Sequence, residues 1–515
     1  MPLPAQWAKV IDQTACIGCH ACTTACKSEN DVPLGVNRTY VKYVDVGTFP
    51  QARRAFQVTR CNQCDDAPCV AACPTAAMYR RSDGIVDFDK RICIGCKACM
   101  AACPYDAIFI NPEDHSAEKC NFCAHRLDVG LEPACVVVCP TQAIKVGDLS
   151  DPTSAVARVV GREPVTVRRP EKATRPKLFY RGAHQATLDP LAARRPAGGL
   201  FMWSEQGGGS GHVTSGSPDR GARNGRGAHG SGANSSAAAV LAYDVPHSMP
   251  WDWRVSIYTW TKGIAAGAWL VAVALVLAGT LDWSDSLVAW AAPALAAAFL
   301  AATAALLIAD LEHPERFWLI LARPQWRSWL VRGGFVLSGY AAVLGLHLLG
   351  SALGATGLAR AAAVPGVPLA VLAAIYTAYL FAQAKARDLW QSPLLAPHLA
   401  VQAVLAGAAA LLPVDAALDA GAADELAWVL AGAALTHLLM VSGEVTLAHP
   451  TAHARLAAWE MTHGRYSRWF RSGFLFVACG LAAPLLGAWA APLALAGLLA
   501  HEHAYVQAGQ SVPLA

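Results

Sequence analysis

Cysteine is the residue type in this chain with the clearest capacity for chemistry. Sixteen of the 17 cysteines lie between Cys16 and Cys139, in four groups of four. The groups read Cys16-x2-Cys19-x2-Cys22-x3-Cys26, Cys61-x2-Cys64-x4-Cys69-x3-Cys73, Cys93-x2-Cys96-x2-Cys99-x3-Cys103 and Cys120-x2-Cys123-x11-Cys135-x3-Cys139. Proline follows the last cysteine of every group except the first, where Lys27 follows Cys26. Closely spaced thiolates of this kind are metal ligands.

The intervals between the cysteines indicate which kind of metal centre they bind. Cys-x2-Cys-x2-Cys-x3-Cys-Pro is the ligand pattern of ferredoxin-type [4Fe–4S] clusters, in which three thiolates bind one cluster and the fourth binds its neighbour. A disulfide framework suits small secreted domains, and structural zinc uses pairs of Cys-x2-Cys, so neither fits as well. Sixteen thiolates predict four [4Fe–4S] clusters, assembled in a reducing compartment.

Short elements must position these cysteines. Residues 84–88 alternate apolar and polar side chains as a hairpin strand does, and a turn with a small apolar run follows each Cys-Pro. The repeat predicts an α+β ferredoxin-like iron–sulfur domain over residues 1–150. Residues 1–15 resemble neither a secretory signal nor a twin-arginine leader.

Two less regular segments follow. Residues 151–203 keep apolar and aromatic side chains without clear periodicity, which predicts an arm. Residues 204–250 are rich in Gly, Ser and Arg and are expected to be a flexible linker. Gly225-x-Gly227-x-x-Gly230 matches a dinucleotide pattern, but no strand precedes it and no helix follows it, so a nucleotide site is not expected.

The remainder of the chain is apolar enough to span a membrane. Over 515 residues the hydrophobic fraction is 54% and the charged fraction only 15%, and the net charge of +4 gives no support for nucleic-acid binding. Residues 251–515 are therefore predicted to form an all-α membrane domain of about eight transmembrane helices. The expected spans are 255–279, 287–309, 330–350, 366–384, 394–413, 425–442, 471–488 and 491–508.

Basic residues in the loops predict the orientation. Ten lie on the side of the membrane that carries the N-terminal domain, and only Arg360 lies opposite. The ten are Arg316, Arg323, Arg327, Arg332, Lys385, Arg387, Arg455, Arg465, Arg468 and Arg471. The positive-inside rule then places the iron–sulfur domain on the cytoplasmic face of the inner membrane, although arginines that dock this domain would mimic the signal.

Both halves resemble known families. Residues 16–150 resemble the four-cluster electron-transfer subunit of complex iron–sulfur molybdoenzymes, and residues 251–515 resemble the polysulfide reductase/NrfD membrane subunit. The membrane motifs are Trp251-Asp-Trp253, Lys262-Gly-Ile-Ala-Ala-Gly267, Asp310-Leu-Glu-His-Pro-Glu-Arg-Phe-Trp318, Arg323-Pro324, Tyr376-Thr-Ala-Tyr379 and Ala508-Gly-Gln510. The fusion of two normally separate subunits is unusual.

The resemblance implies how the cysteines are shared among clusters. One set is Cys16, Cys19, Cys22 and Cys139, and its neighbour is Cys26, Cys120, Cys123 and Cys135. The other two sets are Cys61, Cys64, Cys69 and Cys103, and Cys73, Cys93, Cys96 and Cys99. No ligand is replaced, so four cubane clusters are expected.

The resemblance also implies a quinone pocket lined by the first, second and fourth membrane helices. Tyr258 and Tyr376 match positions that contact quinone in relatives, and Asp310 and His313 are the expected proton donors or acceptors. A merely structural role for both tyrosines carries equal weight. Trp251, Trp253 and Trp260 fit an interfacial aromatic belt better than a quinone contact.

Other membrane residues have mainly structural interpretations. His347 and His437 suggest a haem only weakly, because single helix histidines are usually packed. Glu444 and Glu502 either extend a proton path or reach toward the interface. Cys479 is expected to be a packed small residue.

The expected function is that of an oxidoreductase subunit. Electrons would pass through the four clusters between a molybdopterin (Mo or W) catalytic subunit and membrane menaquinone or ubiquinone. The alternatives are an ion-translocating NrfD-like module, which the scarcity of acidic residues at mid-membrane depth disfavours, and a membrane anchor for an electron carrier without its own quinone site.

Overall fold

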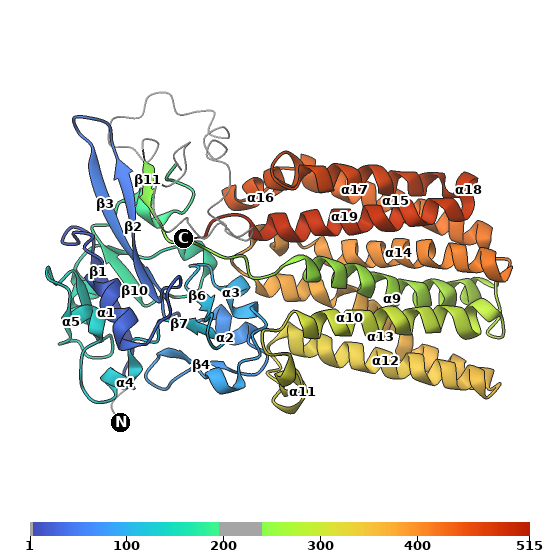
Figure 1. Ribbon diagram of the computed structural model, residues 1–515, viewed down its shortest axis with the longest axis horizontal. Coiled ribbons are helices and arrows are strands. Elements are labelled where there is room, and N and C mark those ends of the chain that lie inside the picture. The colour runs from blue at the N-terminus through green and yellow to red at the C-terminus, as the bar shows by residue number, and fades with distance from the viewer. Residues whose placement is uncertain (1–3, 195–238, 515) are drawn as a thin grey trace. The chain divides into compact units, whose positions relative to one another are not determined.

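The computed structural model describes residues 4–194 and 239–514, and Figure 1 shows their secondary structure. The chain separates into two compact units. One contains the described residues up to Pro250 together with Ala384–Ala386 and residues 511–514, and the other contains Trp251–Gln383 and Arg387–Gln510. Most of the predicted linker, including the glycine motif at residues 225–230, lies outside the described residues.

The first unit is built from short strands and short helices around the cysteines. Its strands are β1 (Trp7–Asp12), β2 (Thr39–Val46), β3 (Arg53–Arg60), β4 (Met78–Arg80), β5 (Val86–Phe88), β6 (Ile108–Ile110), β7 (Ala117–Lys119), β8 (Ile144–Asp148), β9 (Val165–Thr166), β10 (Leu178–Arg181) and β11 (Val240–Tyr243). Its helices are α1 (Ala21–Glu29), α2 (Pro68–Ala72), α3 (Ala98–Ala102), α4 (Ala124–Leu127), α5 (Ala134–Val137), α6 (Ala155–Arg162) and α7 (Gln185–Leu188).

Two sheets and two hairpins organise this unit. A four-stranded sheet has the order β8-β1-β10-β9, and a three-stranded sheet has the order β11-β2-β3. The hairpins β4-β5 and β6-β7 each follow a Cys-Pro, where the repeat predicted a turn and an apolar run. The α+β ferredoxin-like fold expected from the cysteine repeat is confirmed.

The segment predicted as an arm contributes directly to this fold. Strand β10 pairs in parallel with β1, and Leu178 and Tyr180 are almost fully buried. Residues 240–243 pair with β2, so the chain returns to the first unit just before the membrane segments begin.

The second unit is a bundle of long apolar helices (Figure 1). They are α9 (Trp253–Ala278), α10 (Ala292–Ala309) preceded by a π-helical turn (Leu287–Ala291), α12 (Trp329–Ala352), α13 (Thr356–Gln383), α14 (Leu395–Leu418), α15 (Ala423–Thr446), α17 (Ser467–Cys479), α18 (Ala483–Leu486) and α19 (Ala490–Gln510). Short helices α11 (Leu319–Ala322) and α16 (Ala452–Thr462) lie in the connections.

Seven segments among the described residues are long and apolar enough to cross a membrane. The last, Ser467–Gln510, has 44 residues and folds back on itself, because 3-10 turns at Gly480–Ala482 and Gly487–Trp489 interrupt it. Helices α17 and α19 then pack side by side. The expectation of about eight transmembrane helices is confirmed, with the last two forming a hairpin.

Helices α9 and α14 form the centre of the bundle. Their apolar windows are 72% and 67% buried, against 28% for α10 and α12, so lipid-facing area belongs to the outer helices. The two central helices touch through their backbones at Gly267 and Gly407. A Cβ atom on Gly267 would lie 1.7 Å from the carbonyl oxygen of Ala403, so only glycine fits.

Candidate iron–sulfur and membrane sites

The four cysteine groups share one backbone conformation. The residue before the second cysteine has a positive φ in every group: 70° at Gly18, 49° at Gln63, 66° at Gly95 and 65° at Phe122. Side chains other than glycine rarely adopt this conformation, so its retention at Gln63 and Phe122 marks a functional constraint. A short helix begins close to the third cysteine in each of the first three groups and at Ala134 in the fourth.

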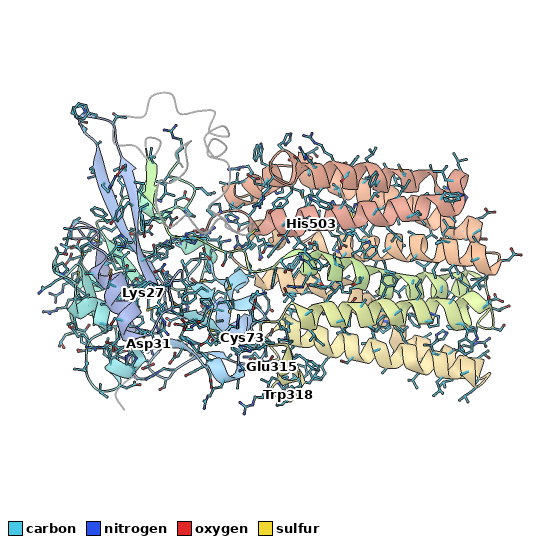
Figure 2. The ribbon with its side chains drawn as sticks, viewed as in Figure 1. Lys27, Asp31, Cys73, Glu315, Trp318 and His503 are labelled. Carbon is cyan, nitrogen blue, oxygen red and sulfur yellow. The ribbon has the colours of Figure 1, made fainter. Side chains whose placement is uncertain are left out.

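Two of the implied ligand sets each surround a cavity. Cys16, Cys19, Cys22 and Cys139 line one cavity. Cys73, labelled in Figure 2, lines a second cavity with Cys93, Cys96 and Cys99. Cysteines separated by up to 123 positions thus meet in fours.

In each of the other two sets, the thiols lie close enough to raise one another's pKa. Burial raises the pKa of Cys26 to about 12, and the nearby thiols of Cys120, Cys135 and Cys123 add to the effect. Burial likewise raises the pKa of Cys64 to about 12, with contributions from Cys61 and Cys103. Thiols in such surroundings keep their protons until a metal ion displaces them, because the thiolate is the ligand.

Cys135 is the exception. Burial raises its pKa, but Arg60 and Lys9 outweigh burial and lower the pKa to about 7. Arg60 Nη1 lies 3.0 Å from Cys135 Sγ, and Lys9 Nζ lies 3.7 Å from the same sulfur. Both cations are at most 2% exposed.

Backbone amides also face the sulfurs. Met78 donates to Cys73 Sγ across 3.3 Å and Ala143 donates to Cys139 Sγ across 3.3 Å. Hydrogen bonds to sulfur are a principal means by which proteins set cluster potentials. Sixteen thiols in fours, with donors aimed at them, form a donor set that fits [4Fe–4S] clusters.

Lys27 replaces the proline found after the other groups. Its ammonium donates to the carbonyl oxygens of Pro33 and Val36, at 2.9 Å and 2.5 Å. Figure 2 labels this residue. The lysine therefore closes the loop that follows α1 and leaves the cysteine spacing unchanged.

In the membrane unit, Lys262 connects the residues predicted for the quinone pocket. It is 1% exposed, and its Nζ donates to the Ala374 carbonyl and to Thr377 Oγ1, both at 2.7 Å. The same nitrogen lies 4.9 Å from the centre of the Tyr376 ring, a cation–π distance. Tyr258 lies on α9 one turn before Lys262 and is 3% exposed.

The predicted acidic partner joins this group. Tyr376 and Asp310 are close enough to Tyr258 to act on its hydroxyl electrostatically. Asp310 ends α10 and is 8% exposed. His313 lies in the following loop, where its Nδ1 is 3.0 Å from Glu315 Oε1. The structure thus gathers Tyr258, Tyr376 and Asp310, while His313 pairs with Glu315.

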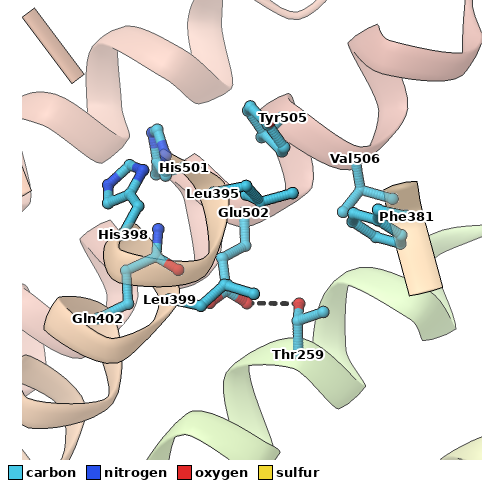
Figure 3. A pocket seen from close by; sticks show the side chains of 10 residues that line it. All are labelled: Thr259, Phe381, Leu395, His398, Leu399, Gln402, His501, Glu502, Tyr505 and Val506. Atoms are coloured by element: carbon cyan, nitrogen blue, oxygen red, sulfur yellow. Dashed lines mark hydrogen bonds between the residues drawn. The ribbon is translucent and has the colours of Figure 1, made fainter. Parts of the chain in front are cut away.

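Sequence reasoning missed the contact between a buried glutamate of α19 and helix α9. Glu502 on α19 is 5% exposed, and Thr259 Oγ1 donates to its Oε2 across 2.5 Å, as Figure 3 shows. Lys262 lies about one turn after Thr259 on α9. A lysine and a glutamate inside apolar segments were the available signal, because charges within a membrane are costly unless paired.

The aromatic motif residues take two different positions. Trp251 is 5% exposed and stacks on Phe381 and Trp390, with ring centres 5.8 Å and 5.6 Å apart. Gln510 donates to the Trp251 carbonyl, so the first and last membrane motifs contact each other. Trp253 is 51% exposed, as a belt residue is.

Comparison with known proteins assigns both halves. Residues 53–149 match the 4Fe-4S dicluster domain, and residues 244–500 match the polysulphide reductase NrfD family. A tetrathionate reductase subunit of Salmonella typhimurium is 43% identical over 209 residues, which are 39% of this chain and 80% of that protein. A polysulfide reductase subunit of Wolinella succinogenes is 43% identical over 177 residues, 34% of this chain and 93% of that protein.

A third relative is the thiosulfate reductase electron transfer subunit of Salmonella typhi. It is 45% identical over 179 residues, which are 34% of this chain and 92% of the relative. The chain belongs to the family of iron–sulfur electron-transfer subunits of such reductases, here continued by an NrfD-type membrane domain. It is a multi-pass membrane protein that carries iron–sulfur clusters.

Proposed function

We propose that this chain relays electrons through four [4Fe–4S] clusters between a catalytic subunit and quinone in the membrane. The observation that carries the proposal is the gathering of sixteen cysteines into four sets of four in the first unit. Each set contains the ligands of one cubane cluster, with the sixteen cysteines assigned as the family resemblance implies.

The protein residues do the binding and the proton chemistry. Bound clusters supply one-electron steps, while reduction of a quinone takes two electrons and two protons. In this proposal the Tyr258 and Tyr376 hydroxyls donate hydrogen bonds to quinone oxygens, and Asp310, buried at the end of α10, exchanges protons. Lys262 orients this group by fixing the backbone of α13 at Ala374.

The names of the relatives and the charges in the loops support the proposed partner and location. The reductase names of the relatives support a catalytic partner, for which we propose a molybdopterin subunit that holds Mo or W. The ten basic residues at one end of the bundle support a cytoplasmic iron–sulfur domain at the inner membrane. The quinone is menaquinone or ubiquinone.

The test begins with the native complex in detergent. We expect a co-purifying large subunit that contains Mo or W, and about sixteen iron atoms per chain. Cytochromes in place of a Mo or W subunit would contradict the proposed partner. An iron content near eight would contradict the cluster count.

Two tyrosines on α13 provide a variant and its matched control for testing the quinone reaction. Tyr376→Phe should lower the rate of quinol-dependent cluster reduction about tenfold, because it removes one hydrogen-bond donor. Tyr379→Phe, one turn later, is the control, because Tyr379 is 38% exposed and stacks on Trp329. Equal rates in both variants would remove Tyr376 from the quinone site, and no reduction by any quinol would favour the membrane-anchor function.

Ion translocation is a second candidate, favoured by one observation. Two ionisable side chains, Lys262 on α9 and Glu502 on α19, are buried within the bundle. In proteoliposomes, Glu502→Gln should abolish proton transfer coupled to quinone turnover while electron transfer continues. Uncoupled turnover in the unmodified protein would exclude this function.

A further inference from the structure

Three histidines from three helices meet inside the membrane unit. His398 on α14, His437 on α15 and His501 on α19 are 5%, 1% and 2% exposed. Their ring centres are 4.9 Å, 4.8 Å and 5.7 Å apart. More than 30 positions separate each histidine from the next, so only the packing of the helices brings them together.

The nitrogen atoms of these rings are arranged as metal ligands are. One ring nitrogen from each histidine can be chosen so that all three lie within 4.8 Å of one another. His398 Nε2 and His437 Nδ1 are 3.0 Å apart. Two nitrogens bound to one zinc ion at about 2.05 Å in tetrahedral geometry are about 3.3 Å apart, so this pair already has nearly the required spacing.

His347 shows how a structural histidine in the same bundle differs. Trp269 Nε1 donates to His347 Nδ1 across 3.2 Å, and His347 Nε2 donates to the Val288 carbonyl across 3.1 Å. Both of its ring nitrogens therefore have protein partners. Among the three clustered histidines, His398 Nε2 and His437 Nδ1 instead hydrogen-bond to each other, a contact in which a metal ion can take the place of the shared proton.

A small cavity adjoins the cluster. His398 and His501 line it together with Glu502 and Gln402 (Figure 3). Gln402 lies one turn after His398 and is 4% exposed, yet its Oε1 has no hydrogen-bond partner among the residues that the structure describes. A buried amide oxygen without a partner is costly and indicates an additional group, such as a metal-bound water.

We propose that His398, His437 and His501 bind a transition-metal ion of the class that imidazole prefers, zinc or copper. Three neutral imidazoles supply three ligands, and the fourth position faces the cavity, where a water can donate to Gln402. The Glu502 carboxyl lines the same cavity. The ion ties α14, α15 and α19 together.

The proposal rests on neither the clusters nor the quinone reaction, so its test does not depend on them. The complex is purified with a tag other than polyhistidine, and zinc and copper are measured beside iron. We expect about one zinc or copper ion per chain, and X-ray absorption at its edge should show nitrogen neighbours at about 2.0–2.1 Å. Sulfur neighbours at about 2.3 Å would instead place the ion on cysteines.

Two variants locate the ion. His437→Gln should lose it, or bind added Zn²⁺ at least a hundredfold more weakly, with the iron content unchanged. His347→Gln is the control and should keep it. Retention of the ion in His437→Gln would overturn the proposal, as would wild-type protein that neither contains zinc or copper nor takes up Zn²⁺ or Cu⁺ after chelator treatment. Metal content and absorption of the unmodified protein decide between these outcomes even if a variant fails to fold.

Discussion

Arg60 donates a hydrogen bond from Nη1 to the sulfur of Cys135 across 3.0 Å, and both side chains are buried. Lys9 Nζ lies 3.7 Å from the same sulfur. Two buried cations at one cysteine stabilise negative charge on its ligand set more than on the other three. Because reduction adds an electron, the set with Cys26, Cys120, Cys123 and Cys135 should hold the cluster of highest potential among the four.

Removal of the Arg60 charge should lower that potential. We expect Arg60→Gln to shift one of the cluster midpoints downward by about 60 mV or more, which is tenfold in a one-electron equilibrium. The measurement is a redox titration followed by electron paramagnetic resonance. Arg175→Gln is the control, because Arg175 is 67% exposed and solvent screens its pair with Asp66. Equal shifts in the two variants would show that Arg60 has no special relation to one cluster.

A buried histidine makes the first unit sensitive to alkaline pH. His247 lies between two carboxylates, with Nδ1 2.5 Å from Asp106 and Nε2 3.2 Å from Asp244. Burial lowers its pKa, but the two carboxylates outweigh burial and raise the pKa to about 9. Tyr40 packs against the ring and Lys42 lies 3.9 Å from Asp244. Burial also raises the pKa of Tyr40 well above its usual value, so that phenol stays neutral.

The sign of the effect follows from the raised pKa. The protonated His247 stabilises the fold fully below its unfolded pKa of about 6.5, and this contribution is lost as the pH rises through about 9. It is worth about 3 kcal/mol, or about 6–12 °C in melting temperature for a unit of this size. Thermal unfolding, followed by the visible iron–sulfur absorbance, should show that loss between about pH 6 and about pH 10.

His247→Gln should flatten this pH dependence and lower stability near neutral pH. His125→Gln is the matched control, since His125 forms an exposed pair with Glu29. If the melting temperature of His247→Gln falls with rising pH as steeply as that of the unmodified protein, other groups cause the alkaline transition.

The cysteine spacing predicted the fold of the first unit because ligand sets impose strong local geometry. Turns with positive φ and short helices follow directly from a chain that must wrap a cluster. Strand β10 was not predicted, because Leu178–Arg181 is only four residues long and its partner β1 lies far away in sequence. Pairing at such a distance has no local signal.

The membrane spans were predictable from hydropathy, and the polar sites within them only partly so. Tyr258, Tyr376 and Asp310 were found through family motifs. His398, His437 and His501 were not found together, since each is a single polar residue on its own helix and only the helix packing brings them within reach. Lys262 and Glu502 were visible as charges, but their proximity depends on how α9 packs against α19.

Two glycines one turn apart on α9 should respond very differently to alanine. The Gly263-x3-Gly267 pattern indicates close helix packing at both positions, but a Cβ on Gly263 would meet only Ala406 Cβ at 4.0 Å. At Gly267 the Cβ would overlap the Ala403 carbonyl at 1.7 Å. Gly267→Ala should force α9 and α14 apart and cost about 3 kcal/mol or more.

Thermal aggregation in detergent measures this difference. Gly263→Ala should melt within a degree or two of the unmodified protein, whereas Gly267→Ala should melt far lower or fail to accumulate in membranes. Similar behaviour of the two variants would mean that α9 and α14 do not touch at Gly267.

Neighbouring glycines on α12 offer a way to move Tyr376 without changing it. A Cβ on Gly333 would lie 2.4 Å from the Tyr376 ring, whereas a Cβ on Gly334 would meet Ile320 at an ordinary 3.6 Å. Gly333→Ala should therefore displace the Tyr376 ring from its place beside Lys262. If Tyr376 orients quinone, kcat/KM for quinol should fall about tenfold in Gly333→Ala and stay unchanged in Gly334→Ala, with full iron content in both. Unchanged quinol kinetics in a stable Gly333→Ala protein would remove Tyr376 from the quinone site, because the substitution cannot be accommodated while the ring stays where it is.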